Sequence, residues 1–116
     1  MAFDFRSDTV TLPTPAMMQA IARAPLGDAA RGEDPSVNEL ERLAALLTGK
    51  AEAMFLPSGA MANLCALIAH DCRGGEVIVE AASHLYNAEG AGLSVVAGAM
   101  PRPIAGVRGV MPFSRA

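Results

Sequence analysis

Short apolar runs alternate with segments of helical length along the second half of the chain. The short runs have the length of buried strands, and the longer segments between them have the length of helices. The expected strands are 53–56, 76–80 and 95–99, and the expected helices are 62–71 and 85–93. The alternation predicts parallel strands joined by helices in a βαβαβ order. We therefore expect an α/β fold with an incomplete parallel sheet flanked by helices.

Residues 1–15 are expected to form an extended arm. The segment 3–15 is rich in β-branched and polar residues, and Pro13 and Pro15 disfavour helix before Ala16. The remainder, 16–116, is expected to be part of one domain, because its length and the 52% hydrophobic content of the chain suit a single core.

Two helices are expected between the arm and the alternating region. The first spans 16–23 and is followed by a loop that ends at Pro35. Ser36 is expected to cap the second helix, with Glu39 at the capping-box position three residues further on. Gly49 is expected to end this helix.

The tail from Met100 onward is expected to contain neither helix nor strand. Its prolines and glycines leave no periodic pattern, and no element follows that would close the sheet. Three parallel strands with unpaired edges make a poor independent fold. We therefore expect 16–116 to be truncated at its C-terminus, and the isolated chain to aggregate or to be only partly ordered.

Composition argues against several classes of partner. The net charge is −3 and no Lys/Arg cluster occurs, so neither a nucleic acid nor a membrane surface is expected as a partner. No apolar run approaches the roughly 18 to 20 residues of a membrane helix. Asp4 and Asp8 lie where a signal peptide would be basic, and the expected location is cytoplasmic.

The two cysteines are expected to be reduced core thiols. Cys65 and Cys72 lie about 10 Å apart along one predicted helix, which is beyond the reach of a disulfide. Together with His70 they do not have the spacing of a metal site.

The turn Ser58-Gly59-Ala60 is a candidate phosphate site whose signal is weak on its own and gains weight from other segments. It lies between an expected strand and an expected helix, where free backbone N–H groups and the helix dipole bind phosphate. The alternative is purely structural, with Ser58 as an N-cap and Gly59 as a tight turn.

His84 is expected at the same edge of the sheet. It follows the second expected strand by a few residues, and parallel sheets bind ligands at the carboxyl ends of their strands. With the phosphate turn it becomes a candidate to lie over an aromatic cofactor ring, and the alternative is a structural or solvated histidine. Glu89 follows by more than one helical turn, so both the same site and an exposed face stay open.

Two further positions are weighed for chemistry. Ser7 and Asp8 have no role in an expected helix or strand, so the arm either reaches a site or is a plain surface segment. Lys50 is the only lysine and precedes the first expected strand, at the amino edge of the sheet. It is expected to be a solvated charge opposite the candidate site.

Four segments together resemble the threonine aldolase family, whose members are pyridoxal-phosphate (PLP) enzymes of fold type I. They are Arg6–Pro15, Gly32–Pro35, Leu56–Asn63 and Ser83-His84. The resemblance implies the N-terminal part of the large domain of that fold and a homo-oligomer in the complete enzyme. The implied reaction is reversible cleavage of a β-hydroxy-α-amino acid, such as threonine or allo-threonine, to glycine and an aldehyde.

The resemblance also implies roles for individual residues. Ser58, Gly59 and Ala60 correspond to the phosphate-binding turn, His84 to a histidine stacked on the pyridine ring, Ser7 to a substrate contact, and Glu89 to an acidic residue beside the site. His84 and Glu89 are thus the expected catalytic residues, and no metal is implied.

Three departures from the family pattern are expected to matter. Ala60 stands where the family commonly has threonine, which removes a hydroxyl but keeps the backbone donors. Arg31 stands where the family often has an aromatic residue, which affects substrate preference. Three further groups of the family's site lie later in the family's sequence than the part that resembles this chain. They are the PLP-binding lysine, the carboxylate that pairs with the pyridine nitrogen and the arginines that bind the substrate carboxylate. The isolated chain is therefore expected to be inactive, and borohydride trapping of stoichiometric PLP on Lys50 would overturn this.

Two alternatives stay open. One is a non-catalytic remnant that binds a phosphate ligand or a full-length subunit. The other is a PLP lyase with a different reaction, such as β-elimination, because a scaffold does not fix the chemistry.

Overall fold

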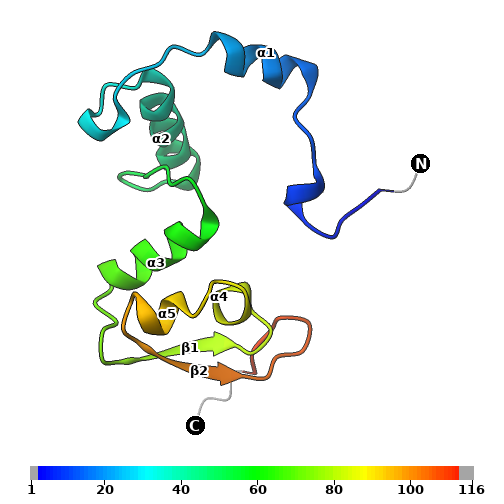
Figure 1. The fold of residues 1–116 in the computed structure, drawn as a ribbon, viewed down its shortest axis with the longest axis vertical. Helices are drawn as coiled ribbons and strands as arrows, with labels where there is room; N and C mark the ends of the chain where they lie inside the picture. The colour runs from blue at the N-terminus through cyan, green and yellow to red at the C-terminus, as the bar shows by residue number, and fades with distance from the viewer. Residues whose placement is uncertain (1–2, 113–116) are drawn as a thin grey trace. The chain divides into compact units, whose positions relative to one another are not determined.

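The computed structural model describes residues 3–112, and the chain divides between Phe55 and Leu56 into two compact units. The N-terminal unit contains η1 (Asp8–Val10), α1 (Pro15–Arg23), η2 (Ala29–Arg31) and α2 (Pro35–Thr48). The C-terminal unit contains α3 (Gly59–Ala69), β1 (Glu76–Glu80), α4 (His84–Asn87), α5 (Gly92–Val95) and β2 (Met100–Ile104) (Figure 1). The predicted α/β class with parallel strands is confirmed.

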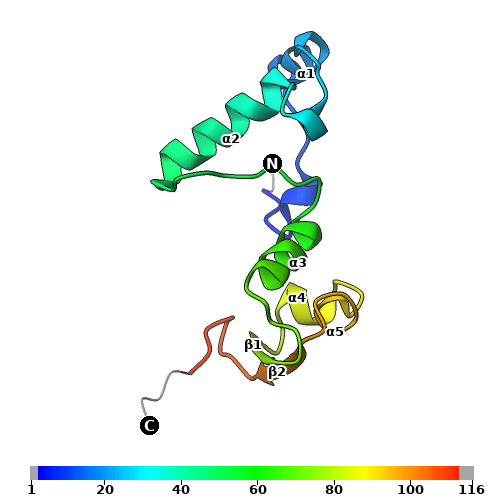
Figure 2. The same ribbon diagram turned by 90° about the vertical axis from the view of Figure 1, so that its left-hand side faces the viewer.

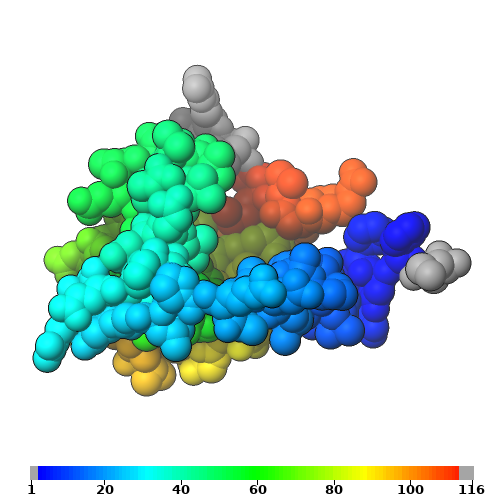
Figure 3. Space-filling view, turned by 90° about the horizontal axis from the view of Figure 1, so that it is seen from above, coloured from blue at the N-terminus to red at the C-terminus, as the bar shows by residue number. Residues whose placement is uncertain are grey.

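Side-chain caps begin the two longer helices of the N-terminal unit. Thr14 Oγ1 accepts a hydrogen bond from Met17 N (3.2 Å) and caps α1, whose surface is blue in Figure 3. Asp34 Oδ1 accepts from Ser36 N (2.9 Å) and Val37 N (3.0 Å) and caps α2. In both helices a proline follows the cap, because its fixed φ suits the first helical position and no N–H is needed there.

Ser36 is not the N-cap of α2, so this prediction is wrong. Asp34 takes the position because its carboxylate reaches two backbone N–H groups at once. Ser36 instead donates from its hydroxyl to a carbonyl of the preceding loop (3.0 Å), and Glu39 pairs with Arg42 (2.7 Å). The predicted end of the helix is confirmed, since Gly49 follows it with a left-handed φ of 65°.

A short 3-10 helix, η1, interrupts the arm that was expected to be extended up to Ala16. Ser7 Oγ accepts a hydrogen bond from Thr9 N (3.2 Å) and caps this turn. Serine and threonine side chains bond readily to nearby backbone groups, and such bonds favour a local turn over an extended chain.

The C-terminal unit is built on a parallel pair of strands. β1 pairs with β2 in register from Glu76 opposite Met100 to Glu80 opposite Ile104. Helices α4 and α5 lie against one face of this pair, and α3 packs against α5 on the same side (Figures 1 and 2). A small core lies between the two layers, formed by Val79, Leu93 and Ala99 with Leu67, Cys72, Val77 and Leu85 packed against it. On the other face of the pair, Ile78 is 58% exposed.

The first of these strands was predicted correctly, whereas the second was not. The predicted strand 95–99 is wrong because Val95 ends α5, and β2 lies in the tail that was expected to contain no strand. Met100 N donates a hydrogen bond to Gly75 O (2.8 Å). The backbone N–H groups of every second residue of β2, starting at Met100, therefore point toward β1. Pro101 and Pro103 occupy the other positions, where their missing N–H groups would point away from β1.

Residues 53–56 form no strand, contrary to the prediction. An isolated strand leaves its N–H and C=O groups unpaired, and no third strand occurs among residues 3–112 to pair with it. The helix predicted over 62–71 is α3. The one predicted over 85–93 is divided into α4 and α5, because Gly90 (φ 60°) and Ala91 (φ 59°) adopt left-handed conformations between them.

The cysteines differ from their expected surroundings. Cys65 is exposed, so its prediction as a core thiol is wrong, and Cys72 lies beyond the end of α3, half-buried against the core. Within 3–112, the side chains form no group of three or more metal-type ligands. No helix of the same residues combines the length and apolar character that a membrane crossing requires.

Candidate functional site

The first turn of α3 presents free backbone donors. Ser58 has an extended backbone, and its Oγ accepts a hydrogen bond from Met61 N (3.2 Å), which satisfies one N–H of the turn. The N–H groups of Gly59 and Ala60 have no acceptor among the described residues. Ser58 is therefore an N-cap, as the structural alternative required, but the turn also keeps two donors that an anion can use.

The residue after the cap distinguishes α3 from the other long helices. α1 and α2 have Pro15 and Pro35 at this position, whereas α3 has Gly59. A Cβ built on Gly59 would have no protein atom within 4 Å, so the space outside this turn is open. Gly59 thus retains an N–H and removes a side chain where a ligand phosphate would approach.

His84 begins α4, in the connection that follows the carboxyl end of β1. The turn after Glu80 is closed by a hydrogen bond from Ser83 N to Glu80 O (2.9 Å). The His84 side chain is 73% exposed, so one edge of the imidazole is accessible. Its other edge is held: His84 Nδ1 lies 2.9 Å from Glu89 Oε1.

Glu89 is a buried carboxylate that joins two helices. Its side chain is 1% exposed, which excludes the exposed face considered from the sequence. The same Oε1 that contacts His84 Nδ1 also accepts a hydrogen bond from Asn63 Nδ2 (2.7 Å). Glu89 Oε2 is buried without a partner among the described residues. Asn63 lies one turn, or about 6 Å, along α3 from Gly59, so this shared oxygen connects His84 to the phosphate-turn helix.

The contact fixes the protonation of the imidazole. An ionised carboxylate only accepts hydrogen bonds, so His84 Nδ1 must donate. In the neutral imidazole, Nε2 then carries a lone pair on the exposed edge of the ring. The arrangement can therefore accept a proton at Nε2 while Glu89 stabilises the resulting positive charge.

Sequence reasoning gave Asn63 no role, although it is the last residue of the segment Leu56–Asn63. Its spacing of four from Gly59 was an available signal, because residues four apart share a helix face. The contact itself was not foreseeable, since Asn63 and Glu89 are 26 positions apart.

Protonation of Glu89 is expected to weaken the C-terminal unit at low pH. The hydrogen bond from His84 is the main cause that lowers the pKa of Glu89, burial opposes it, and Asn63 lowers it further. A carboxyl whose pKa is lower in the folded state stabilises fully above its ordinary value of 4.5, and this is lost as the pH falls through the folded pKa. Urea unfolding at a series of pH values measures the effect.

In Glu89→Gln, the fall of the unfolding free energy at low pH should become smaller, because the titrating carboxyl is gone. Glu52→Gln replaces a glutamate at an exposed position and is the matched control, which should keep the wild-type pH dependence. An unfolding free energy of Glu89→Gln that falls below pH 4.5 as steeply as that of the wild type would contradict the assignment.

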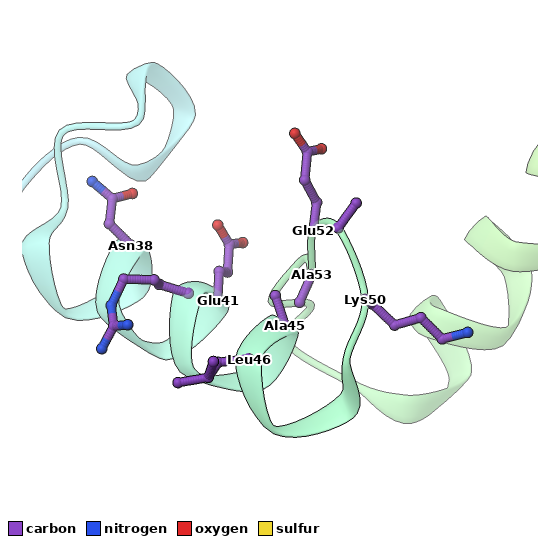
Figure 4. Close-up of a pocket in the computed structure, with 9 residues that line it drawn as sticks. Asn38, Glu41, Ala45, Leu46, Lys50, Glu52 and Ala53 are labelled. Atoms are coloured by element: carbon purple, nitrogen blue, oxygen red, sulfur yellow. The ribbon is translucent and has the colours of Figure 1, made fainter.

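Ser7 and Lys50 belong to the N-terminal unit. Ser7 is exposed and caps η1, and its substrate contact stays a prediction. Lys50 is exposed, as expected of a solvated charge. It borders a hollow of about 510 Å³ along α2, and Figure 4 shows its amine pointing away from that hollow. None of the predicted site residues lines the hollow.

Comparison with known proteins gives a consistent set of relatives. The family model described as Beta-eliminating lyase matches residues 4–116. The low specificity L-threonine aldolase of Escherichia coli K12 is 48% identical over 113 residues, which cover 97% of this chain and 34% of that protein. The probable low-specificity L-threonine aldolase 2 of Arabidopsis thaliana is 45% identical over 102 residues, covering 87% and 29%. Aldolase vrtJ of Penicillium aethiopicum is 43% identical over 109 residues, covering 93% and 28%. The chain thus spans about a third of the length of its relatives.

Proposed function

Since the chain belongs to the beta-eliminating lyase family, we propose that it supplies the phosphate turn and a catalytic histidine of a PLP-dependent threonine aldolase. The observation that carries this proposal is the shared oxygen of Glu89, which connects the helix of the phosphate turn to His84. The segment Leu56–Asn63 and the segment Ser83-His84, which both resemble the same family, are thereby connected through hydrogen bonds to Glu89.

The residues present suit two parts of PLP. The free N–H groups of Gly59 and Ala60, at the positive end of the α3 dipole, suit the phosphate, and the open space outside Gly59 admits it closely. The exposed His84 imidazole suits stacking on the pyridine ring. When bound, PLP supplies an electron sink for the electrons released as the Cα–Cβ bond of the substrate breaks.

The role of His84 in this reaction is proton transfer. Its Nε2 accepts the proton of the substrate β-hydroxyl as the bond breaks, and Glu89 holds the ring through Nδ1. Ser7 is proposed to contact the amino-acid substrate, which is a β-hydroxy-α-amino acid such as threonine or allo-threonine. Ala60 contributes only its backbone N–H, because it has no hydroxyl.

We further propose that the isolated 116-residue chain is inactive and that the active protein is a cytoplasmic homo-oligomer. The only lysine, Lys50, is an exposed residue of the N-terminal unit. Apolar side chains of α1, Met17, Met18 and Ile21, are 54%, 52% and 64% exposed, which supports coverage by further protein.

The test is an assay, with PLP and threonine, of the complete protein to which this chain is proposed to contribute the site, and not of the isolated 116-residue chain. Formation of glycine and acetaldehyde in equal amounts is expected. Formation of ammonia and a keto acid without glycine would instead identify a β-eliminating lyase. Binding of PLP without turnover would favour the non-catalytic remnant.

A further inference from the structure

We infer that Asn63 is a positioning residue that holds His84, through Glu89, in the tautomer whose Nε2 carries the lone pair. The inference rests on the proposed function only for the use of that lone pair. The tautomer itself follows from contacts within the C-terminal unit and is measurable without cofactor or substrate.

Both donors meet a single carboxylate oxygen. Asn63 Nδ2 donates to Glu89 Oε1 at 2.7 Å, and His84 Nδ1 lies 2.9 Å from the same atom. Glu89 Oε2 has no partner among the described residues, so the carboxylate is oriented by these two bonds alone. The Glu89 side chain is 1% exposed, so loss of one of the two donors leaves a buried carboxylate with a single partner among the described residues.

Asn63 is placed firmly enough to orient the carboxylate. The next residue, Leu64, packs on the segment that follows Glu89, where a Cβ on Gly92 would lie 3.0 Å from Leu64 Cδ2. This segment is itself fixed in an uncommon conformation, with Ala91 at a φ of 59°. The contact between Leu64 and Gly92 thus holds α3 against the segment that follows Glu89, next to the Asn63–Glu89 bond.

One consequence is that α3 holds both parts of the proposed site. Its first turn presents the N–H groups of Gly59 and Ala60, and its second turn presents Asn63. A displacement of α3 would move the phosphate donors and the His84 imidazole together. The amide of Asn63 is suited to this task because it donates at any pH and adds no charge to the buried carboxylate.

The experiment is nitrogen NMR of the histidine side chains in the protein labelled with ¹⁵N-histidine, at a pH where the imidazoles are neutral. His84 is assigned by its loss in His84→Gln, and the exposed His70 is the internal reference. In the wild type, His84 should be protonated at Nδ1 and unprotonated at Nε2. In Asn63→Leu, which has similar size but cannot donate, the ratio of the Nδ1–H to the Nε2–H form should fall about tenfold. Asn38→Leu removes an amide that donates to Gly32 O (2.8 Å) in the other unit and should leave the ratio unchanged.

A second variant keeps the test decisive if Asn63→Leu does not fold. Asn63→Asp removes the amide donor at almost unchanged size, places a second carboxylate against Glu89 and should also lower the ratio. A wild-type His84 protonated at Nε2, or an unchanged ratio in folded Asn63→Leu or folded Asn63→Asp, would overturn the inference.

The proposed function is tested separately by the threonine assay. Absence of aldol cleavage together with the expected tautomers would refute the function and leave the positioning role of Asn63 intact. Aldol cleavage with unchanged tautomers in Asn63→Leu would do the reverse.

Discussion

Replacement of His84 by asparagine is expected to lower kcat/KM for aldol cleavage by about 100- to 10,000-fold, the usual contribution of a positioned acid or base. The asparagine amide can still donate to Glu89 Oε1, in the place of Nδ1, so the buried carboxylate keeps its partner. What is lost is the nitrogen at the exposed edge of the ring. Steady-state kinetics of the complete protein with threonine measures the effect, because the isolated 116-residue chain is proposed to be inactive.

The matched control is His70→Asn. His70 is the other histidine of the chain and is the exposed C-cap of α3, so its replacement removes an imidazole without touching the site. Its kcat/KM should be that of the wild type. A His84→Asn enzyme as active as the His70→Asn enzyme would show that the proton is accepted elsewhere.

Replacement of Gly59 by proline is expected to weaken PLP binding by about 10- to 100-fold without weakening the fold. Proline deletes one N–H donor to the phosphate, and a hydrogen bond to a charged group is worth about that factor. The helix should tolerate the change, because Ser58 is extended, as a residue before proline must be, and nothing lies within 4 Å of a Cβ at this position. α1 and α2 already begin in this way.

Two comparisons isolate the phosphate contact. Gly59→Ala keeps the N–H, so it should lose much less affinity than the proline variant. Pyridoxal, which lacks the phosphate, should bind wild type and Gly59→Pro equally. Equal PLP affinity of the alanine and proline variants, measured by titration of the cofactor absorbance, would place the phosphate away from this turn.

The elements that sequence predicted best are those whose signals are local. β1 has three consecutive β-branched residues, Val77, Ile78 and Val79, after a glycine turn, and α2 ends at Gly49, whose left-handed conformation suits glycine. β2 was missed because Pro101 and Pro103 disfavour a strand when taken alone. Only the register against β1 reveals that they occupy the positions that need no N–H on the paired side.

Other predictions from the sequence were wrong because the structure of a segment depends on a neighbouring strand or on two residues that compete for the same capping position. Residues 53–56 have the composition of a strand but no neighbouring strand among the described residues. Asp34 and Ser36 are both good caps, and the carboxylate prevailed because it binds two N–H groups. Sequence pattern alone does not rank such competitors.

The candidate site was foreseeable in its motifs and not in its connections. The segments that resemble threonine aldolases contain Gly59 and His84, and the comparisons confirm the family. The part played by Glu89 depends on α4 and the end of that helix, after which the Glu89 side chain meets both His84 and Asn63. A three-way contact of this kind requires the fold.

The most direct measurement is a crystal structure of the protein with PLP bound. We expect the phosphate to accept hydrogen bonds from the N–H groups of Gly59 and Ala60, with the pyridine ring stacked on the His84 imidazole. A phosphate bound at another helix, or a ring with no contact to His84, would contradict the single site proposed for the α3 turn and His84.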